Sequence, residues 1–297
     1  MNSVVVENIA KNYGKVAALK GVSFAVPKGE IFGIIGADGA GKTTLFRILT
    51  TLLLADSGSA TVEECDVVKQ YRQIRAQVGY MPGRFSLYQD LTVEENLTFF
   101  ATLFGTTIKE NYYLIEDIYK QIEPFKDRRA GKLSGGMKQK LALCSALIHC
   151  PSVLFLDEPT TGVDPVSRKE FWTMLRRLKD RGITILVSTP YMDEATLCDR
   201  IGLMAQGQFL MIDTPQAIVE QFGEPLWAIS GAQMSRLLYD LRDNQEVTSC
   251  YAFGDVHHVT TTKDLDLRKY LESKGHVNVE IKQIEASVED CFMKLNQ

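Results

Sequence analysis

The stretch "GADGAGKTT", from Gly36 to Thr44, constrains the fold more than any other part of the sequence. It follows the apolar run "EIFGIIG" and precedes "KTTLFRILTTLLL", whose pattern predicts a helix. A strand, a glycine-rich loop and a helix are therefore expected in direct succession. Such a loop turns its backbone N–H groups inward, and the start of the helix adds further donors and partial positive charge. This arrangement is typical of a site for phosphate groups.

The loop also fits the pattern G-x-x-x-x-G-K-[ST] through Gly36, Gly41, Lys42 and Thr43. In such loops the lysine reaches the β- and γ-phosphates of a nucleotide, and the hydroxyl of the next residue binds Mg²⁺. The alternative is an ordinary glycine-rich turn, but the strand before it and the helix after it argue against that. The rest of the predicted phosphate site is Ala37, Asp38, Gly39, Ala40 and Thr44.

Two carboxylates follow another buried strand, in "SVLFLDEP". Asp157 and Glu158 stand at its carboxyl end, where α/β sheets place their ligand sites. Asp157 suits a partner of Mg²⁺, and Glu158 could orient or deprotonate an attacking water. Such a pair alone is weak evidence, because strand-end acids are often merely solvated. The phosphate loop in the same chain favours the functional interpretation.

A second anion-binding helix start is predicted in "LSGGMKQK". Ser134, Gly135 and Gly136 precede a run that reads as a helix, and serine and glycine at such a point leave backbone N–H groups free to bind an anion. Taken alone, the same residues could form an ordinary structural cap of the helix.

Strands and helices alternate along most of the chain, and the strands are apolar throughout. This pattern predicts an α/β fold with a mainly parallel sheet covered on both faces. Together with the phosphate loop, it resembles a P-loop NTPase (RecA-like) core. Helical patterns between about residues 84 and 150 predict an inserted helical subdomain. After residue 222 short strands surround two helical pieces, so we expect an ATPase domain over 1–222 and a small α+β domain over 223–297.

Composition excludes several classes of function. The formal net charge of −4 does not favour a nucleic-acid partner. The six cysteines are scattered without a CxxC pair, so neither a zinc site nor a disulfide framework is predicted. No window reaches the ~18 apolar residues that a spanning helix needs, so any membrane segment is expected to come from another chain.

Taken together, these motifs resemble the nucleotide-binding subunits of ABC transporters. The matching landmarks run in the family order over residues 3–222: Tyr13, the phosphate loop, "LSGGM", "LFLDEP" and "TTGVD" with Asp164. The resemblance implies ATP and Mg²⁺ as cofactors, Tyr13 stacking on adenine, Thr43 and Asp157 holding the metal, and Lys42 and Glu158 acting in catalysis. It also implies a head-to-tail dimer, in which Ser134, Gly135 and Gly136 contact the γ-phosphate bound by a second ATP-binding subunit.

The tail "IEASVEDCFMKL" resembles the "PSLEDVFL" ending of exporter subunits with ABC-2 type membrane partners, although a generic amphipathic helix would share the pattern. The resemblance implies transmembrane permease partners and a peripheral place on the cytoplasmic face of the cell membrane. We expect these partners to contact residues 83–100, which include Phe85 and Leu87. These two apolar residues could equally belong to the core of the helical subdomain.

Two family positions are substituted. The family usually has glutamine where this chain has Gly83, and histidine where it has Pro190. Pro190 follows Glu158 at about the family interval, so the histidine is replaced in place. A further change, Asp38 where asparagine is common, concerns a less critical position. Glycine offers no side-chain ligand, and proline has neither a proton-bearing ring nor a backbone N–H. Loss of one preorganised group at a transferring phosphate can reduce the rate by about 10²–10³-fold.

These substitutions suggest a dimer whose two ATP sites differ in activity. The chain's own site is predicted to bind ATP but to hydrolyse it slowly or not at all, while its intact "LSGGM" completes the site of a different partner. A heterodimer is therefore expected rather than a homodimer.

Three alternatives remain. One is a non-transport ABC protein, although the short segment between Lys42 and Ser134 leaves no room for the long coiled coil of the DNA-repair members. Another is a regulatory ATP-binding protein without turnover. The last is an unrelated phosphate-loop kinase or GTPase, against which "LSGGM" and Tyr13 argue.

Overall fold

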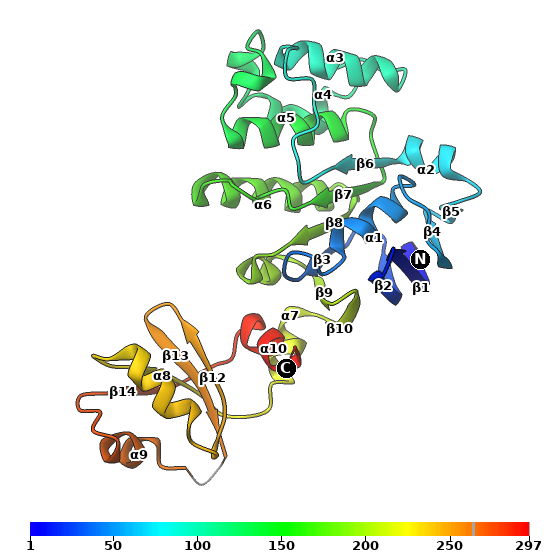
Figure 1. Cartoon of the computed structure of the whole chain (residues 1–297). Coiled ribbons are helices and arrows are strands. Elements are labelled where there is room, and N and C mark those ends of the chain that lie inside the picture. Colours follow the sequence, from blue (N-terminus) through cyan, green and yellow to red (C-terminus); the bar gives the residue numbers. More distant parts are fainter. Residues whose placement is uncertain (263–264, 297) are drawn as a thin grey trace. The chain divides into compact units, whose positions relative to one another are not determined.

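The computed structural model describes residues 1–262 and 265–296 (Figure 1). The chain forms two compact units, which are described separately. The first is Met1–Pro215, and the second begins at Gln216. Within the described ranges, no helix is long and apolar enough to cross a membrane.

A six-stranded sheet forms the centre of the first unit (Figure 1). In spatial order its strands are β10 (Gln208–Asp213), β9 (Arg200–Ala205), β3 (Ile31–Ile35), β8 (Thr184–Thr189), β7 (Val153–Asp157) and β6 (Val78–Met81). All neighbouring pairs are parallel except β10 with β9. Every residue of β3, β7 and β8 is buried, as expected for strands covered on both faces. The predicted mainly parallel sheet is confirmed.

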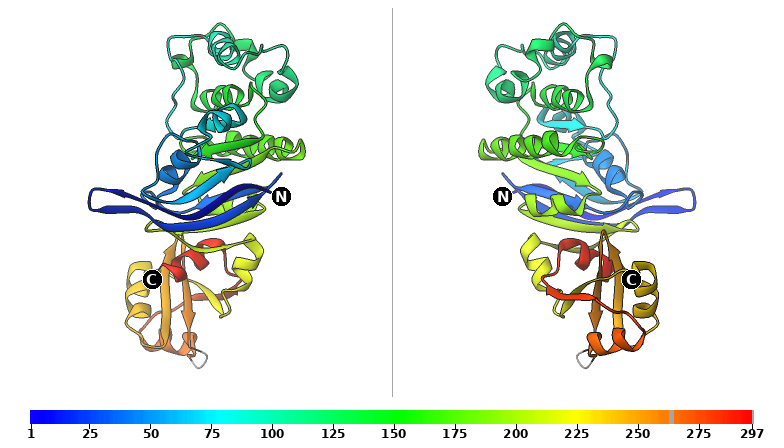
Figure 2. Two further views of the ribbon diagram at one scale, coloured as in Figure 1. Left: turned by 90° about the vertical axis from the view of Figure 1, so that its right-hand side faces the viewer. Right: turned by 90° about the vertical axis from the view of Figure 1, so that its left-hand side faces the viewer.

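An antiparallel sheet made largely from the N-terminal segment adds a second layer to this core. Its strands, in spatial order, are β2 (Val16–Pro27), β1 (Asn2–Tyr13), β4 (Ser57–Val62) and β5 (Cys65–Asp66). The long hairpin of β1 and β2 is drawn in dark blue in Figure 2. Its inward residues, among them Val4 and Val26, join one hydrophobic cluster with Phe46 and Phe155 of the central layer.

Helices join the strands of the central sheet. They are α1 (Lys42–Leu49), α2 (Tyr71–Gln77), α6 (Pro165–Asp180) and the short 3₁₀ helix η3 (Met192–Leu197). Phe46 of α1 meets Phe155 of β7 edge-on, with ring centroids 5.5 Å apart. Asp164 caps α6 by accepting a hydrogen bond from the Ser167 N–H at 3.0 Å. These contacts fix α1 and α6 beside the strand ends that carry the predicted site.

Helices alternate with turns over the segment 84–150, for which the sequence predicts an inserted helical subdomain. It contains α3 (Val93–Leu103), α4 (Tyr112–Tyr119), α5 (Gly135–Leu147) and the 3₁₀ turns η1 (Glu123–Phe125) and η2 (Ala130–Lys132). Thr92 and Glu95 form a capping box at the start of α3. The fully buried Asn96 was not predicted to matter. Its amide group bonds to backbone atoms of Tyr88, Leu91 and Thr92, and so fixes the loop before α3.

The second unit is built on a four-stranded antiparallel sheet. In spatial order the strands are β12 (Val247–Phe253), β13 (Val256–Thr261), β11 (Leu226–Ser230) and β14 (Glu280–Ile284). Helix α8 (Met234–Arg242) follows β11, and α9 (Leu267–Ser273) precedes β14, which gives the order of a split βαβ fold. Their buried leucines, among them Leu237 and Leu271, pack in one cluster with Ile229 and Val259 of the sheet.

Helices α7 (Pro215–Glu220) and α10 (Val288–Leu295) lie side by side in this unit. The Cys291 thiol donates to the Ile218 carbonyl at 3.4 Å, and the Lys294 ammonium donates to the Phe222 carbonyl at 2.7 Å. The sequence predicts the domain boundary after residue 222, which is C-terminal to α7. The chain instead divides between Pro215 and Gln216, so α7 after its first residue belongs to the second unit.

The predicted tail helix α10 is anchored by one carboxylate. Asp290 is 5% exposed, and its carboxylate closes a capping box with Ser287 at the start of the helix. The other carboxylate oxygen, Oδ1, forms a hydrogen bond with Nδ1 of His258 in β13 at 2.7 Å. His258 itself stacks on Phe253, with ring centroids 4.1 Å apart. The acidic residue of the tail motif thus fixes the helix to the sheet face opposite α8.

We predict that Asp290→Ala destabilises the second unit by about 2 kcal/mol, because it leaves buried donors without their charged acceptor. Urea unfolding followed by the fluorescence of Trp227, in a Trp172→Phe background, measures the change in the free energy of unfolding. Glu285→Ala removes an exposed carboxylate from the same tail and is the matched control. Equal effects of the two substitutions would contradict the anchoring role.

Candidate functional site

The phosphate loop lies between β3 and α1, and its glycines stand where the backbone demands them. Gly39 and Gly41 have φ angles of 81° and 110°, in the region that L side chains rarely adopt. A Cβ atom at Gly36 would lie 2.1 Å from the Met204 carbonyl oxygen, and one at Gly41 would lie 2.5 Å from that of Ala18. The loop is therefore pressed against neighbouring backbone at both of its defining glycines.

The remaining loop residues leave the site open to a ligand. Ala37, Asp38 and Gly39 are exposed, Ala40 is buried, and Thr43 and Thr44 are half-buried. Among the described residues, no side chain caps α1. The N–H groups of its first turn are therefore available to an anion, as the sequence predicts.

Lys42 lies at the centre of the loop with only 3% of its surface exposed. Its ammonium donates to the carbonyl oxygens of Gly36 and Ala37 at 2.7 and 3.1 Å. The same nitrogen lies 3.3 Å from Oε1 of Glu158. The two residues predicted to act in catalysis, from two separate motifs, are thus brought into contact.

The acidic pair is held by the neighbouring strand β8. Asp157 is 3% exposed, and its Oδ1 accepts a hydrogen bond from the Ser188 hydroxyl at 2.6 Å. The Glu158 N–H donates to the carbonyl and hydroxyl oxygens of Ser188. Glu158 has a φ of 50°, which costs about 1 kcal/mol or more for a residue with a side chain. The hydrogen bonds to Ser188 hold the Glu158 backbone in this unfavourable conformation.

The donors near the loop fit a magnesium ion. The Thr43 hydroxyl and the Asp157 carboxylate are oxygen donors, the class that Mg²⁺ prefers. Within the described residues, Ser188 is the one hydrogen-bond donor recorded for the Asp157 carboxylate, and it uses only Oδ1. The second oxygen, Oδ2, is left for a metal-bound water or for the ion itself.

Gly83, one of the substituted positions, lies directly against the acidic pair. A Cβ atom at residue 83 would be 3.0 Å from the Asp157 carbonyl oxygen and 3.7 Å from Cβ of Glu158. A side chain at this position would therefore begin beside the candidate catalytic carboxylate. This chain presents only backbone there.

Pro190, the other substituted position, directly follows a residue bonded to the phosphate loop. Thr189 ends β8, and its carbonyl accepts from the Gly36 N–H at 3.3 Å. Pro190 is thus the next residue in the chain after one that is hydrogen-bonded to the phosphate loop, as the family pattern implies. Proline brings no hydrogen-bond donor to this place.

Sequence reasoning missed Glu194, which lies in η3 and is 1% exposed. Its carboxylate accepts from the Thr160 hydroxyl at 2.7 Å and from the Thr189 hydroxyl at 2.6 Å, and lies 3.6 Å from Nε of Arg168. It therefore ties the loop after Glu158 to the strand end before Pro190. A glutamate in "MDEATL" carries no local signal for such a role.

Ser134, Gly135 and Gly136 begin α5, and the Ser134 hydroxyl accepts from the Met137 N–H at 3.3 Å. A Cβ atom at Gly136 would lie 3.1 Å from the Ser167 hydroxyl oxygen, so this helix start lies beside the start of α6. Both of the interpretations offered by the sequence are compatible with this geometry, because the serine caps the helix and the glycines keep its approach free of side chains.

Tyr13 ends β1 in the hairpin with β2, and 47% of its surface is exposed. An exposed ring at the end of a strand is available for stacking, which is what the resemblance implies for it.

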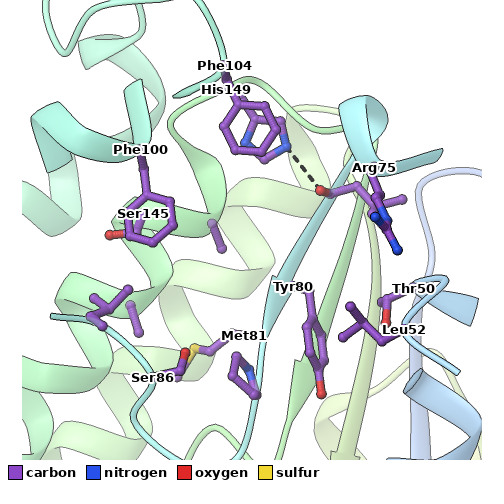
Figure 3. A pocket seen from close by; sticks show the side chains of 15 residues that line it. Thr50, Leu52, Arg75, Tyr80, Met81, Ser86, Phe100, Phe104, Ser145 and His149 are labelled. Carbon is purple, nitrogen blue, oxygen red and sulfur yellow. Dashed lines mark hydrogen bonds between the residues drawn. The ribbon is translucent and has the colours of Figure 1, made fainter. Parts of the chain in front are cut away.

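A cavity of about 410 Å³ lies between β6, α3 and α5 (Figure 3). Its lining is mainly apolar and includes Leu87, one of the two residues predicted to meet a partner, but not Phe85. His149 stacks on Phe104 with ring centroids 3.9 Å apart and bonds to the Val78 carbonyl, and burial lowers the pKa of its imidazole. Arg75, held by two hydrogen bonds to Thr51, brings a positive charge to the cavity.

Comparisons with known proteins place the chain in a family. The model of the ABC transporter family matches residues 19–161. The probable multidrug ABC transporter ATP-binding protein YbhF of Escherichia coli is 41% identical over 220 residues, 72% of this chain but only 38% of that protein. The chain therefore spans well under half the length of that relative.

Another match covers nearly the whole length of both proteins. The Nod factor export ATP-binding protein I of Burkholderia lata is 35% identical over 97% of this chain and 95% of its own. Among solved structures, cbiO1 from Clostridium perfringens, part of the ABC transporter complex cbiONQ, is 28% identical with a TM-score of 0.66, over 74% of this chain and 92% of that one. This chain belongs to the ATP-binding proteins of the ABC transporter family.

Proposed function

We propose that the chain is the ATP-binding subunit of a multi-subunit exporter, which binds Mg-ATP at a dimer interface and couples it to transport by membrane partners. The observation that carries the proposal is the position of Lys42, which is buried in the phosphate loop, donates to two of its backbone carbonyls and lies 3.3 Å from the Glu158 carboxylate. The names of the similar proteins, which concern multidrug transport and Nod factor export, support export as the direction.

Each residue has a role in this proposal. Lys42 and the first turn of α1 hold the phosphates, while Thr43 and Asp157 hold Mg²⁺, which neutralises charge on the transferring phosphate. Glu158 orients or deprotonates the attacking water. The exposed ring of Tyr13 stacks on the adenine, and Ser134, Gly135 and Gly136 at the start of α5 meet the nucleotide of the other subunit.

The proposal predicts that Lys42→Ala weakens Mg-ATP binding by 10- to 100-fold, because a hydrogen bond to a charged group contributes about 1.5–3 kcal/mol. Equilibrium binding of a fluorescent ATP analogue measures the change. The control is Lys138→Ala, which removes a different lysine of the same unit. The Lys138 ammonium lies over the Phe85 ring. Wild-type protein that binds no nucleotide would overturn the proposed function.

We also propose that the chain's own site is catalytically impaired and that its partner is a different ATP-binding subunit. Gly83 and Pro190 offer no side-chain donor at two places that adjoin Asp157, Glu158 and the phosphate loop. Hydrolysis would then occur at the partner's phosphate loop, faced by Ser134, Gly135 and Gly136 of this chain. A second ATPase reading frame beside this gene would support the pairing, and its absence would count against it.

The cavity between β6, α3 and α5 is proposed to receive a permease segment. Most of the residues that line the cavity are apolar. They include the positively charged Arg75 but no aspartate or glutamate. An amphipathic helix with an apolar side chain and a neighbouring acidic residue would suit it. Co-purification with membrane chains, reduced by Arg75→Glu, would test this contact.

A further inference from the structure

Glu194 of η3 is a buried carboxylate with a partner on each of its oxygens. Its Oε1 accepts from the Thr160 hydroxyl at 2.7 Å, and its Oε2 accepts from the Thr189 hydroxyl at 2.6 Å. Both threonines are buried as well, so neither hydroxyl can turn to water instead. Among the described residues, the cation within ion-pair distance of this carboxylate is Arg168, whose Nε lies 3.6 Å from Oε1. A polar network that is satisfied and shielded from solvent in this way holds its members in fixed positions.

One arm of this network leads to the phosphate loop. Thr189 ends β8, and its carbonyl accepts from the Gly36 N–H at 3.3 Å. Its hydroxyl donates to Glu194 and accepts from the Tyr191 N–H at 3.1 Å. These contacts do not involve the side chain of residue 190. The replacement of the family histidine by Pro190 therefore leaves this connection intact.

The other arm leads to the start of α6. The Thr160 carbonyl accepts from the Val163 N–H at 3.2 Å, and the turn that they form is followed by Asp164, the cap of α6. Arg168, which contacts the same carboxylate, lies near the beginning of that helix. The start of α6 adjoins the start of α5, as the close approach of Gly136 to this helix shows.

We propose that Glu194 is a positioning residue that transmits the state of the chain's own phosphate loop to the starts of α5 and α6. The inference rests on the proposed function, in which the start of α5 faces the nucleotide of the other subunit. A nucleotide that moves the loop acts on Thr189 through the Gly36 hydrogen bond, and the carboxylate passes the displacement to Thr160 and Arg168. Occupancy of the chain's own site then sets the geometry of the site that the chain completes for its partner.

The test measures how well the chain completes a site on another molecule. The full-length chain, as donor, is mixed with a second chain that carries Gly83→Gln, Pro190→His and Ser134→Arg. That second chain has a complete phosphate site but a blocked α5 start, so phosphate release reports the site that the donor completes. Thr160→Val in the donor should lower this turnover by about tenfold, because a hydrogen bond to a carboxylate is lost. Thr173→Val, on the exposed side of α6, is the matched control and should leave the turnover unchanged.

A cycle of substitutions in the donor distinguishes transmission from a merely structural role. Lys42→Ala leaves the donor's own loop largely empty at a Mg-ATP concentration that fills the wild-type loop, and it should also lower turnover at the second chain's site. If Glu194 transmits the state of the loop, adding Thr160→Val to Lys42→Ala should reduce turnover little further, because no signal remains to be interrupted. Two independent effects would instead multiply.

Nucleotide binding and folding are followed in the same variants. Thr160→Val should bind a fluorescent ATP analogue as tightly as the wild-type chain, because its hydroxyl lies on the α6 side of the carboxylate. Where Thr160→Val lowers the thermal unfolding midpoint, Glu194→Gln takes its place in the cycle, since it keeps the size of the side chain and one acceptor oxygen.

Two results would overturn the proposal: losses that multiply in the cycle, or full turnover when the donor carries Thr160→Val or Glu194→Gln. Failure of the proposed function has a different signature. If the mixture with the unaltered donor releases no phosphate, the shared site itself is refuted, and the link through Glu194 with it.

Discussion

Glutamine at position 83 together with histidine at position 190 is expected to raise the ATP turnover of the purified chain by about 10²–10³-fold. The glutamine would enter beside the acidic pair, since a Cβ atom at residue 83 lies 3.7 Å from that of Glu158. Its approach of 3.0 Å to the Asp157 carbonyl requires that backbone to shift slightly. The histidine would restore a donor next to Thr189, which is already bonded to the phosphate loop. Phosphate release at saturating Mg-ATP measures the gain.

The matched control is the Gly83→Ala/Pro190→Ala chain, which changes the same backbone positions without adding the functional groups. It should gain nothing. Glu158→Gln in the restored background should abolish the new activity, because it removes the carboxylate proposed to act as the general base. The impairment would be refuted by a wild-type rate typical of intact family members, or by a restored chain that stays as slow as the alanine control.

Mixing two defective chains is expected to produce activity that neither has alone. The first is the restored chain with Ser134→Arg, which has a complete phosphate site but a blocked α5 start. The second is the wild-type chain, whose α5 start is intact. A head-to-tail dimer of the two contains one complete site, so its turnover should exceed that of either chain by about 10²-fold.

The control for this experiment is a mixture of the Ser134→Arg restored chain with wild-type chain that also carries Ser134→Arg. Both α5 starts are then blocked, and the mixture should stay inactive. Activity there would mean that Ser134, Gly135 and Gly136 only cap their helix. Light scattering with Mg-ATP and a Glu158→Gln background reports separately whether the chains associate.

The sequence allowed the phosphate loop, the acidic pair and the mainly parallel sheet to be predicted, because each depends on residues close together in the chain. The spacing of Gly36, Gly41 and Lys42 specifies a local backbone shape, and the apolar run before Asp157 specifies a buried strand. The capping box of Thr92 and Glu95 is likewise local, because its two residues lie close together in the chain.

Features that depend on distant side chains escaped prediction. Glu194 gains its position from Thr160, far back in the sequence, and Lys42 meets Glu158 only after β3 and β7 enter one sheet. The attachment of α10 through His258 is likewise invisible in the tail motif. Local pattern indicates which groups exist, whereas tertiary packing decides which of them touch.

The pairing of α7 with α10 determines where the chain can be shortened. A protein ending at residue 222 would keep α7 but lose the helix that bonds to it, leaving Ile218 and Phe222, now 1% and 6% exposed, without that cover. Uncovered apolar surface of this kind promotes aggregation. Expression of the first unit alone should therefore end near Pro215, and the second unit should be produced with α7 at its beginning.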